Sequence, residues 1–368
     1  MKIESVEIYR VAMPLIYPFR TAFSDEEAIE SILVRMNSDG VAGWGESSPW
    51  RGPLYSSEWA HGAFSLARDW LAPMLIGRDV ASGHELQHIL APVKGNYFAK
   101  ASLDLAWWDL HAAMVGKPLW QVIGGTGPTV TVGADLGVME NLDLLLGEIG
   151  KAQADGFKRV KLKYRPGWEL EMIAAVRSAF PDLTIHVDCN SAYTLADLPM
   201  FRELDAHNLA MIEQPLAHDD LLDHAQLQAS LRTPVCLDES IVSPEKVRKA
   251  LQVKACRWVN IKLGRSGGLT HALTIHDLCQ EAGMPCWVGG MLESSVGQAH
   301  NIAFATLPNI RYPSDIFPTT RFYREDLGEP PIVLSGPSQV VASPSPGIGH
   351  RPDPGRLQRF LVESATVK

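Results

Sequence analysis

The 368-residue chain has few cysteines, no excess of basic residues and no long apolar run. Its five cysteines are odd in number and form no C-x-x-C pair, which predicts reduced, mostly buried thiols. With 33 basic and 42 acidic residues the formal net charge is −9, which argues against nucleic acid or an anionic membrane as partner. No apolar run approaches the roughly 18 residues of a membrane helix, and the first residues contain no signal-peptide core. We therefore expect a soluble, cytoplasmic protein with no membrane partner.

Two familiar site motifs are also missing. The twelve histidines show no H-x-H or H-E-x-x-H spacing, so they are expected to be surface or core residues. The sequence GGTG at 124–127 matches G-x-G-x-x-G poorly and leads into a strand, which excludes a dinucleotide site.

The order of the expected elements divides the chain into two domains. Strand patterns near the N-terminus are followed by helical patterns at 57–75 and 96–116, which favours an α+β domain over 1–125. The C-terminal segment, about 320–368, is rich in proline and glycine, and we expect it to pack back onto this domain and complete it. From 126 to 319 strands and helices alternate strictly, as in βαβ units.

Eight strand-like runs with seven intervening helices predict an α/β fold, a closed (β/α)7β barrel related to the TIM barrel. The runs lie at 129–136, 159–163, 183–188, 209–213, 233–238, 256–262, 284–290 and 309–313. Polar or special residues mark the ends of six of these strands at intervals of 24 or 25 residues: Lys163, Asp188, Glu213, Asp238, Lys262 and, within the run 284–290, Trp287. A chain that returns to one rim at this period passes around a barrel.

Three consecutive strand ends carry carboxylates. Asp188, Glu213 and Asp238 end the third, fourth and fifth strands, at the rim where such barrels place their chemistry. Adjacent acids repel each other, and a divalent cation would offset that repulsion. Oxygen ligands without His or Cys favour Mg²⁺ over Zn²⁺. The alternative, that the acids cap the following helices, explains one of them more easily than three at a fixed period.

Two lysines end strands on opposite sides of the predicted barrel. Lys163 ends the second strand and Lys262 the sixth, half the circumference away, so we expect them to face each other across the mouth. Lys161 shares a strand face with Lys163, and a neighbouring positive charge lowers the pKa of a lysine toward the range useful for a base. A solvated edge strand is the alternative. A proton removed next to a carboxylate leaves an enediolate, which Mg²⁺ and a second lysine stabilise.

The motifs K-x-K, D-C-N, E-Q-P, D-E-S, N-I-K-x-G and G-G-M-x-E resemble the enolase superfamily, in its muconate-lactonizing-enzyme-like branch. That superfamily is already known for combining a lysine base with Mg²⁺. The resemblance covers essentially the whole chain. It is widest to the o-succinylbenzoate synthase and N-acylamino acid racemase family, through PFRTAF (18–23), GPLYSSEW (52–59) and PSDIF (313–317).

This resemblance implies a capping domain whose loops at 18–23 and 49–57 close over the barrel. It assigns Asp188, Glu213 and Asp238 to Mg²⁺, with Mn²⁺ as the alternative ion, Lys163 and Lys262 to acid/base positions, and Lys161 to tuning Lys163. The substrate contacts that it implies are Phe19, Phe23, Tyr55, Asp135, Asn190, Arg265, Met291 and Glu293.

Three positions bear on specificity. Arg265 matches an arginine of family members with racemase ability. Cys189 stands where the family often has alanine, which we interpret as a packing change. Asp135 falls where relatives tend to carry a serine, and an acid there would repel a succinyl carboxylate unless it is turned away or paired.

We predict a Mg²⁺-dependent enzyme that removes the proton α to the carboxylate of a small-molecule substrate, and we expect a homo-oligomer. In dehydration to o-succinylbenzoate, Lys163 would take the proton and return it to the leaving hydroxyl, while Lys262 stabilises the enediolate. In racemisation of an N-acylamino acid, the two lysines would serve opposite faces. We place the synthase first. The alternatives are the racemase as main activity, or another epimerase or cycloisomerase of the same branch.

Three other classes stay open on the residues alone. The sequence GRSGG at 264–268 fits the G-x-S-x-G of a nucleophile elbow, with Asp277 or Asp315 and His300 as triad partners. That interpretation leaves the carboxylate series unexplained. A strand-end lysine could form a Schiff base in a metal-independent aldolase. A non-catalytic barrel that serves as a binding scaffold is the third class.

Overall fold

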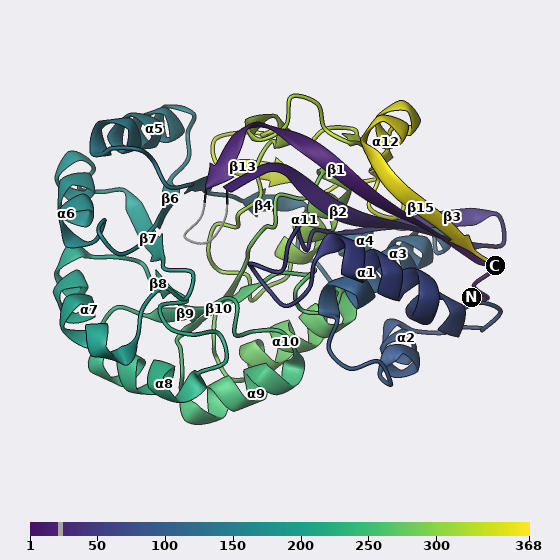
Figure 1. Ribbon diagram of the computed structural model, residues 1–368, viewed down its shortest axis with the longest axis horizontal. Coiled ribbons are helices and arrows are strands. Elements are labelled where there is room, and N and C mark those ends of the chain that lie inside the picture. The colour runs from purple at the N-terminus through teal and green to yellow at the C-terminus, as the bar shows by residue number, and fades with distance from the viewer. Residues whose placement is uncertain (21–24) are drawn as a thin grey trace.

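The computed structural model describes residues 1–20 and 25–368. Figure 1 shows an antiparallel sheet covered by helices on one side of the molecule, and a curled parallel sheet with helices around its outside on the other. The antiparallel sheet has the order β15-β1-β2-β3, formed by β1 (Ser5–Arg20), β2 (Asp25–Ser38), β3 (Val41–Ser47) and β15 (Leu361–Val367). Both chain ends therefore belong to one sheet.

The helices on this sheet are α1 (Ala60–Leu66), α2 (Gly83–Leu90) and α3 (Tyr97–Met114). Helix α3 lies directly on β3, because Gly43 and Gly45 leave room for its backbone. A Cβ atom at Gly43 would lie 2.2 Å from the Leu110 nitrogen, and one at Gly45 would lie 2.3 Å from the Ser102 oxygen. The helix predicted at 96–116 is confirmed, with Gly116 just beyond its end at φ +70°. The pattern at 57–75 forms α1, a π-helical turn (Ala67–Leu71) and a 3-10 turn (Ala72–Met74).

The parallel sheet has the order β11-β10-β9-β8-β7-β6-β5. Its strands are β5 (Ala134–Leu136), β6 (Arg159–Lys163), β7 (Thr184–Asp188), β8 (Ile212–Glu213), β9 (Val235–Leu237), β10 (Trp258–Ile261) and β11 (Cys286–Val288). Around its outside lie α5 (Leu142–Ala154), α6 (Leu170–Ala179), α7 (Leu198–Leu204), α8 (Leu221–Ser230), α9 (Pro244–Val253) and α10 (Leu269–Glu281). Helix α11 (Ser295–Ala305) follows β11 and is buried along its whole length. The predicted α/β fold of βα units is confirmed. In the part of the chain that the structure describes, it is a curled half-barrel of seven parallel strands whose edge strands β5 and β11 do not pair with each other.

Two of the predicted barrel strands are wrong in detail. The run at 129–136 forms two strands. The first, β4 (Thr129–Thr131), pairs with β13 (Gln339–Val341), and only the second, β5, enters the parallel sheet. The run at 309–313 forms no strand. It makes one bridge to β11, between Ile310 and Cys286, and the next residue, Ser314, bridges Val132. An irregular segment thus fills the gap between β11 and β5.

The C-terminal part returns to the antiparallel sheet. After β12 (Gly328–Glu329) and β14 (Arg351–Pro352), which pair with each other, α12 (Pro354–Phe360) leads into β15. Strand β15 then pairs with β1 in antiparallel register, Val6 opposite Val367. The short helix α4 (Leu119–Val122) connects α3 to β4.

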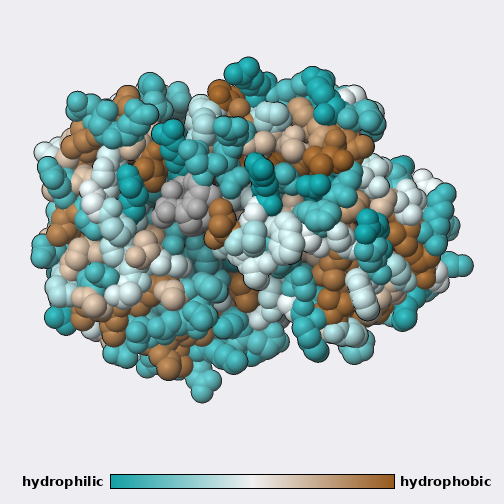
Figure 2. All heavy atoms as spheres, viewed as in Figure 1, coloured by the Kyte–Doolittle hydropathy of each residue, from teal (hydrophilic) through white to brown (hydrophobic). Residues whose placement is uncertain are grey.

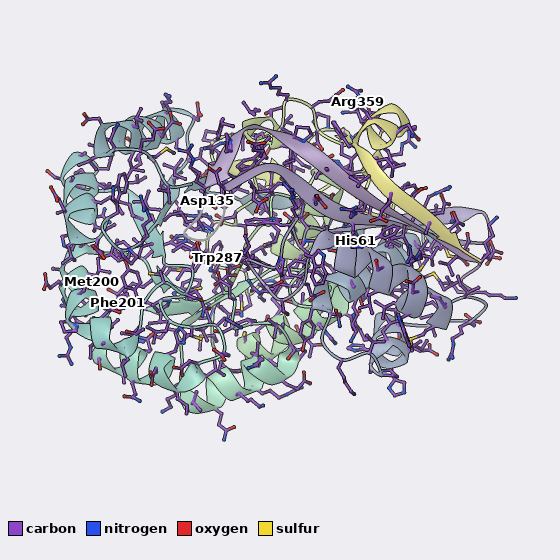
Figure 3. All side chains as sticks on the ribbon, in the orientation of Figure 1. His61, Asp135, Met200, Phe201, Trp287 and Arg359 are labelled. Atoms are coloured by element: carbon purple, nitrogen blue, oxygen red, sulfur yellow. The ribbon has the colours of Figure 1, made fainter. Side chains whose placement is uncertain are left out.

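The face drawn in Figure 2 is largely hydrophilic, and the cysteines lie in the interior. Figure 2 shows hydrophilic residues over most of one face, with hydrophobic residues in scattered groups. All five cysteines are free and buried, as predicted. Within the described residues, no helix has the length and apolarity needed to span a membrane. Figure 3 shows Asp135 and Trp287 inside the ring of barrel helices.

Candidate active site

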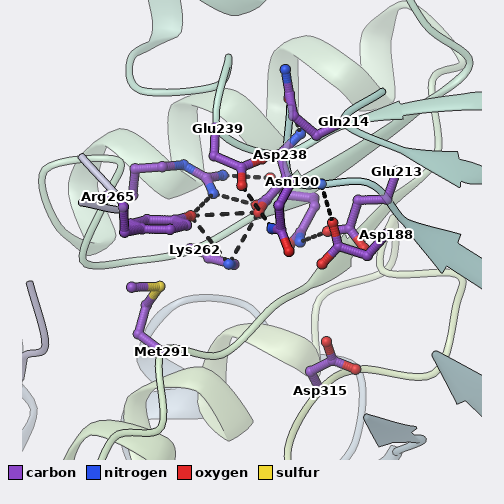
Figure 4. Close-up of polar contacts among 12 residues, drawn as sticks. Asp188, Asn190, Glu213, Gln214, Asp238, Glu239, Lys262, Arg265, Met291 and Asp315 are labelled. Carbon is purple, nitrogen blue, oxygen red and sulfur yellow. Dashed lines mark hydrogen bonds and ion pairs between the residues drawn. The ribbon is translucent and has the colours of Figure 1, made fainter. Parts of the chain in front are cut away.

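The three predicted carboxylates lie at one rim of the parallel sheet. Asp188 and Glu213 are the last residues of β7 and β8 and stand opposite each other in the strand register. Asp238 directly follows β9. All three are buried, with at most 2% exposure. Figure 4 shows them in one group with Glu239 and Asn190.

Cationic side chains contact these carboxylates. The Lys163 Nζ atom lies 2.7 Å from Asp188 Oδ2, and the Lys262 Nζ atom lies 3.0 Å from Asp238 Oδ2. Arg265 forms an ion pair with the other oxygen of Asp238. Two of the three buried carboxylates, Asp188 and Asp238, are therefore paired with cationic side chains of the same rim.

A preformed metal site is not present in this arrangement. Across residues 1–20 and 25–368, no group of three or more His, Cys, Asp and Glu side chains stands ready to hold a metal ion. Lysine and arginine instead take carboxylate oxygens that the predicted Mg²⁺ would need. The Mg²⁺ site therefore stays a prediction. What can be compared with the needs of Mg²⁺ is the set of oxygen atoms at this rim.

The donor set does fit an oxygen-preferring dication. Glu239, next to Asp238, has a buried Oε2 atom without a hydrogen-bond partner. Burial, together with Asp238 and Asp188, raises the pKa of Glu239 to about 7. Burial and Asp188 also raise the pKa of Glu213 well above its usual range. Carboxyl groups whose pKa values are raised by burial and by neighbouring carboxylates, and whose donor atoms are all oxygens, suit a dication such as Mg²⁺. The sequence prediction missed Glu239, although the quoted D-E-S motif contains it.

Most of the predicted site residues line a single cavity. Lys163 comes from β6 and Lys262 directly follows β10, so the two lysines approach from either side of the three carboxylate strands. The other predicted residues of the lining are Phe19, Tyr55, Asp135, Lys161, Asn190, Met291 and Glu293. Trp50, Gly290, Leu292, Gln298, Asp315 and Phe317 complete it. The predicted residues outside this lining are Asp188, Glu213, Asp238 and Arg265, and Arg265 contacts Asp238. Phe23 lies outside the described residues.

The loop after β3 carries aromatic residues into the barrel mouth. The Tyr55 hydroxyl accepts hydrogen bonds from Lys262 Nζ at 3.1 Å and from Arg265 at 2.9 Å. Trp50 Nε1 donates to the Met291 carbonyl at 3.1 Å. The N-terminal part of the chain thus touches both a rim lysine and the rim loop after β11.

The pKa values of the two rim lysines are set by their carboxylate partners. Burial lowers the pKa of Lys163, Asp188 raises it and Lys161 lowers it, and the net pKa is above the ordinary value. Burial lowers the pKa of Lys262, whereas Asp238 and Tyr55 raise it by more. The net pKa of Lys262 is therefore also above the ordinary value. Lys161 acts on Lys163 in the predicted direction. The predicted net decrease is wrong for this structure, because an ion pair at 2.7 Å outweighs it.

Lys161 is surrounded by acids. Its Nζ atom lies 2.5 Å from Asp315 Oδ2 and 3.2 Å from Asp135 Oδ2. Asp135 is therefore paired, which is one of the two conditions under which an acid at that position tolerates an anionic substrate. Asp315 was quoted in PSDIF but considered only as a triad member, so its contact with Lys161 was missed.

The nucleophile-elbow interpretation is wrong. Ser266 is buried and its hydroxyl donates to the Lys262 carbonyl at 2.8 Å. The ring nitrogens of His300 lie 3.2 Å from the Val296 carbonyl and 3.1 Å from the Leu105 carbonyl. A serine hydrolase needs a hydrogen bond between nucleophile and base, and both of these side chains are engaged with the backbone.

Comparisons with known proteins agree along the whole chain. The N-terminal domain model of the mandelate racemase and muconate lactonizing enzyme family matches residues 3–124, and the enolase C-terminal domain-like model matches residues 146–356. An o-succinylbenzoate synthase of Geobacillus kaustophilus is 43% identical over 361 residues, covering 98% of this chain and 96% of that protein.

Two further relatives are similar. An N-succinylamino acid racemase of Thermus thermophilus is 44% identical over 329 residues, covering 89% of each chain. A crystal structure of an enolase superfamily member from Listeria innocua superimposes with a TM-score of 0.96 at 34% identity, covering 100% of this chain and 99% of that one.

Proposed function

The chain belongs to the mandelate racemase and muconate lactonizing enzyme family of the enolase superfamily, and we propose that it is a Mg²⁺-dependent o-succinylbenzoate synthase. We further propose that the same site racemises N-succinyl or other N-acylamino acids. One observation carries the proposal: Lys163 and Lys262 line one cavity from strands on either side of a buried carboxylate group. Curated relatives with either name support it.

Asp188, Glu213 and Asp238 would hold the Mg²⁺ ion, with Glu239 beside them. Sites of this superfamily generally pair a base with Mg²⁺, and the bound ion supplies stabilisation of negative charge on the substrate carboxylate. With Asp188 and Asp238 bound to Mg²⁺, Lys163 and Lys262 would lose the ion pairs that raise their pKa values. Burial would then act on both amines in the direction that lowers the pKa and favours the neutral form.

In the dehydration, the Lys163 amine takes the proton from the carbon α to the carboxylate. The resulting ammonium returns that proton to the leaving hydroxyl, so the C–H and C–O bonds break and water leaves. The Lys262 ammonium stabilises the negative charge that develops on the carboxylate. Tyr55 and Asp238 hold Lys262 in place for this role.

Racemisation uses the same two lysines in turn. One amine removes the α-proton from its face, and the opposite ammonium delivers a proton to the other face. Arg265 favours this second activity. It contacts both Asp238 and Tyr55, the two partners of Lys262, and so keeps a second base on the far side of the cavity.

The wider proposal has three parts. We propose a capping domain of residues 1–125 completed by about 320–368, and a catalytic domain of 126–319. The pairing of β15 with β1 supports this division. We propose a cytoplasmic location, supported by five free cysteines. Third, we propose that the protein forms a homo-oligomer. The substrate in this proposal is a small-molecule carboxylate.

The test is a parallel assay of both reactions with Mg²⁺ and with EDTA as control. The hydroxylated precursor of o-succinylbenzoate and the two enantiomers of an N-succinylamino acid are the substrates, and kcat/KM decides which activity dominates. Lys262→Ala should abolish racemisation in both directions and keep exchange of the α-hydrogen from one face. Near wild-type rates for Lys163→Ala in both reactions would overturn the assigned roles. Borohydride trapping of substrate on either lysine would favour the aldolase instead.

A further inference from the structure

Strand β6 directs three cations, not two, into the barrel. Arg159, Lys161 and Lys163 alternate along the strand and so share one face. Their side-chain exposures increase from 0% at Arg159 to 4% at Lys161 and 9% at Lys163, from the barrel floor to its mouth. A column of like charges in a buried interior requires partners at every level.

Arg159 is held at the bottom of this column. Its guanidinium donates to the carbonyls of Ala134, at 3.1 Å, and of Pro313, and lies over the ring of Trp287 at 5.6 Å. The absence of a side chain at Gly133 makes the room, since a Cβ atom there would lie 2.2 Å from Arg159 Cζ. Arg159 does not belong to the lining of the active-site cavity.

Asp315 connects Arg159 to Lys161. One of its oxygens lies 2.7 Å from the Arg159 guanidinium, and the other lies 2.5 Å from Lys161 Nζ. Its backbone nitrogen donates to the Val288 carbonyl at 2.8 Å, which fixes the carboxylate relative to β11. Positive and negative side chains thus alternate from the floor upward, and Asp188, 3.7 Å from Lys161, connects the column to Lys163.

We propose that Arg159 and Asp315 are positioning residues that hold Lys161 beside Lys163 and thereby support proton transfer at one face of the substrate only. Arg159 neutralises part of the Asp315 charge, so that Lys161 stays within reach of Asp188 instead of being drawn toward the floor. Lys262 is outside this column, because its partners are Asp238 and Tyr55. The proposal rests on the proposed function, since it needs two lysines that act on opposite faces.

A purely structural ion pair would behave differently. Loss of a core ion pair loosens the barrel as a whole and lowers proton transfer at both faces by similar factors. Loss of a positioning pair lowers it only at the face that Lys163 serves. The ratio of the two rates therefore separates the two roles.

The experiment measures exchange of the α-hydrogen in D₂O by ¹H NMR, with Mg²⁺ and N-succinyl-D- or N-succinyl-L-phenylalanine. Lys163→Ala and Lys262→Ala first identify which enantiomer each lysine deprotonates. Arg159→Met and Asp315→Asn should each lower exchange at the Lys163 face at least tenfold, with exchange at the Lys262 face within threefold of wild type. For Arg159→Met the loss should lie in kcat, with KM within threefold.

The double variant Arg159→Met/Asp315→Asn removes both charges together and covers the case in which a single variant fails to fold. It should still change the ratio of the exchange rates at the Lys163 and Lys262 faces at least threefold. Arg177→Met is the matched control, because Arg177 is a partly buried arginine whose guanidinium donates to the carbonyls of His207 and Leu183, on an outer barrel helix. Its ratio should equal that of wild type.

An unchanged ratio in all variants, or equal losses at both faces, would overturn the positioning role while leaving the proposed function intact. Absence of exchange with either enantiomer in the wild-type protein would overturn the racemase activity, and this inference with it.

Discussion

Glu46 links the N-terminal sheet to the rim of the barrel, and its titration gives a prediction of known sign. The side chain lies at the end of β3 and is 2% exposed. Its carboxylate accepts hydrogen bonds from the backbone nitrogens of Ser294, at 3.1 Å, and of Gly297, at 2.9 Å, at the start of α11. Both residues lie within four positions after Glu293 of the cavity lining, and Ser294 follows it directly.

The magnitude follows from the pKa of this carboxyl group. Burial raises the pKa of Glu46 from 4.5 to about 7, the hydrogen bonds from Ser294 and Gly297 lower it, and the charge of Glu293 raises it. Between these two values the unfolded chain has lost the proton and the folded protein still holds it, so stability falls as the pH rises. At about 1.4 kcal/mol for each pKa unit, the loss is about 3 kcal/mol by the time the pH exceeds 7.

Glu46→Gln isolates this effect, because the amide has nearly the same shape and does not titrate. Urea unfolding of both proteins at pH 5 and pH 8 measures the gap in unfolding free energy. Other groups that titrate near neutrality, such as Asp109, cancel in the comparison. The unfolding free energy of the variant minus that of the wild type should be about 2–3 kcal/mol larger at pH 8 than at pH 5. A gap that is the same at both would refute this account of the buried carboxyl group.

Three further predictions concern the site and its support. Tyr55→Phe should lower kcat/KM of both reactions by about 10- to 100-fold, because hydrogen bonds to charged groups such as Lys262 and Arg265 contribute about 1.5–3 kcal/mol; a loss below threefold would contradict it. Asp104→Asn should lower the Tm in calorimetry. The Asp104 carboxylate accepts hydrogen bonds from the Thr270 backbone nitrogen at 3.0 Å and from the Thr270 hydroxyl at 2.6 Å, and weakening them should cost about 1–3 kcal/mol of unfolding free energy. An unchanged Tm would speak against that contact. EDTA should abolish both activities, and added Mg²⁺ should restore them and raise the Tm, since it relieves the repulsion among the rim carboxylates; full activity in EDTA would refute the metal site.

The rim of the site could be predicted because it depends on a repeating spacing. Asp188, Glu213 and Asp238 stand at equivalent points of successive βα units, and equivalent points of a parallel sheet fall on one edge. The strand-face rule in the same way placed Lys161 beside Lys163. Both arguments use only neighbours in the chain or in the sheet.

The parts that sequence analysis missed depend on contacts between distant segments. The break after Thr131 and the irregular course of 309–313 arise in the gap between the two edge strands, β5 and β11. Asp315 reaches Lys161 and Arg159 from that closing segment, and no periodicity connects them. The sign of the pKa change at Lys163 required its distance to Asp188, which no pattern of residue types contains.

The central claim is that three strand-end carboxylates share one divalent ion between two lysines. Anomalous diffraction from crystals grown with Mn²⁺, an ion of similar ligand preference, locates such an ion directly. We predict one peak within bonding distance of Asp188, Glu213 and Asp238, with Lys163 and Lys262 on either side of it. A peak bound by other residues, or none while the protein remains active, would contradict the account.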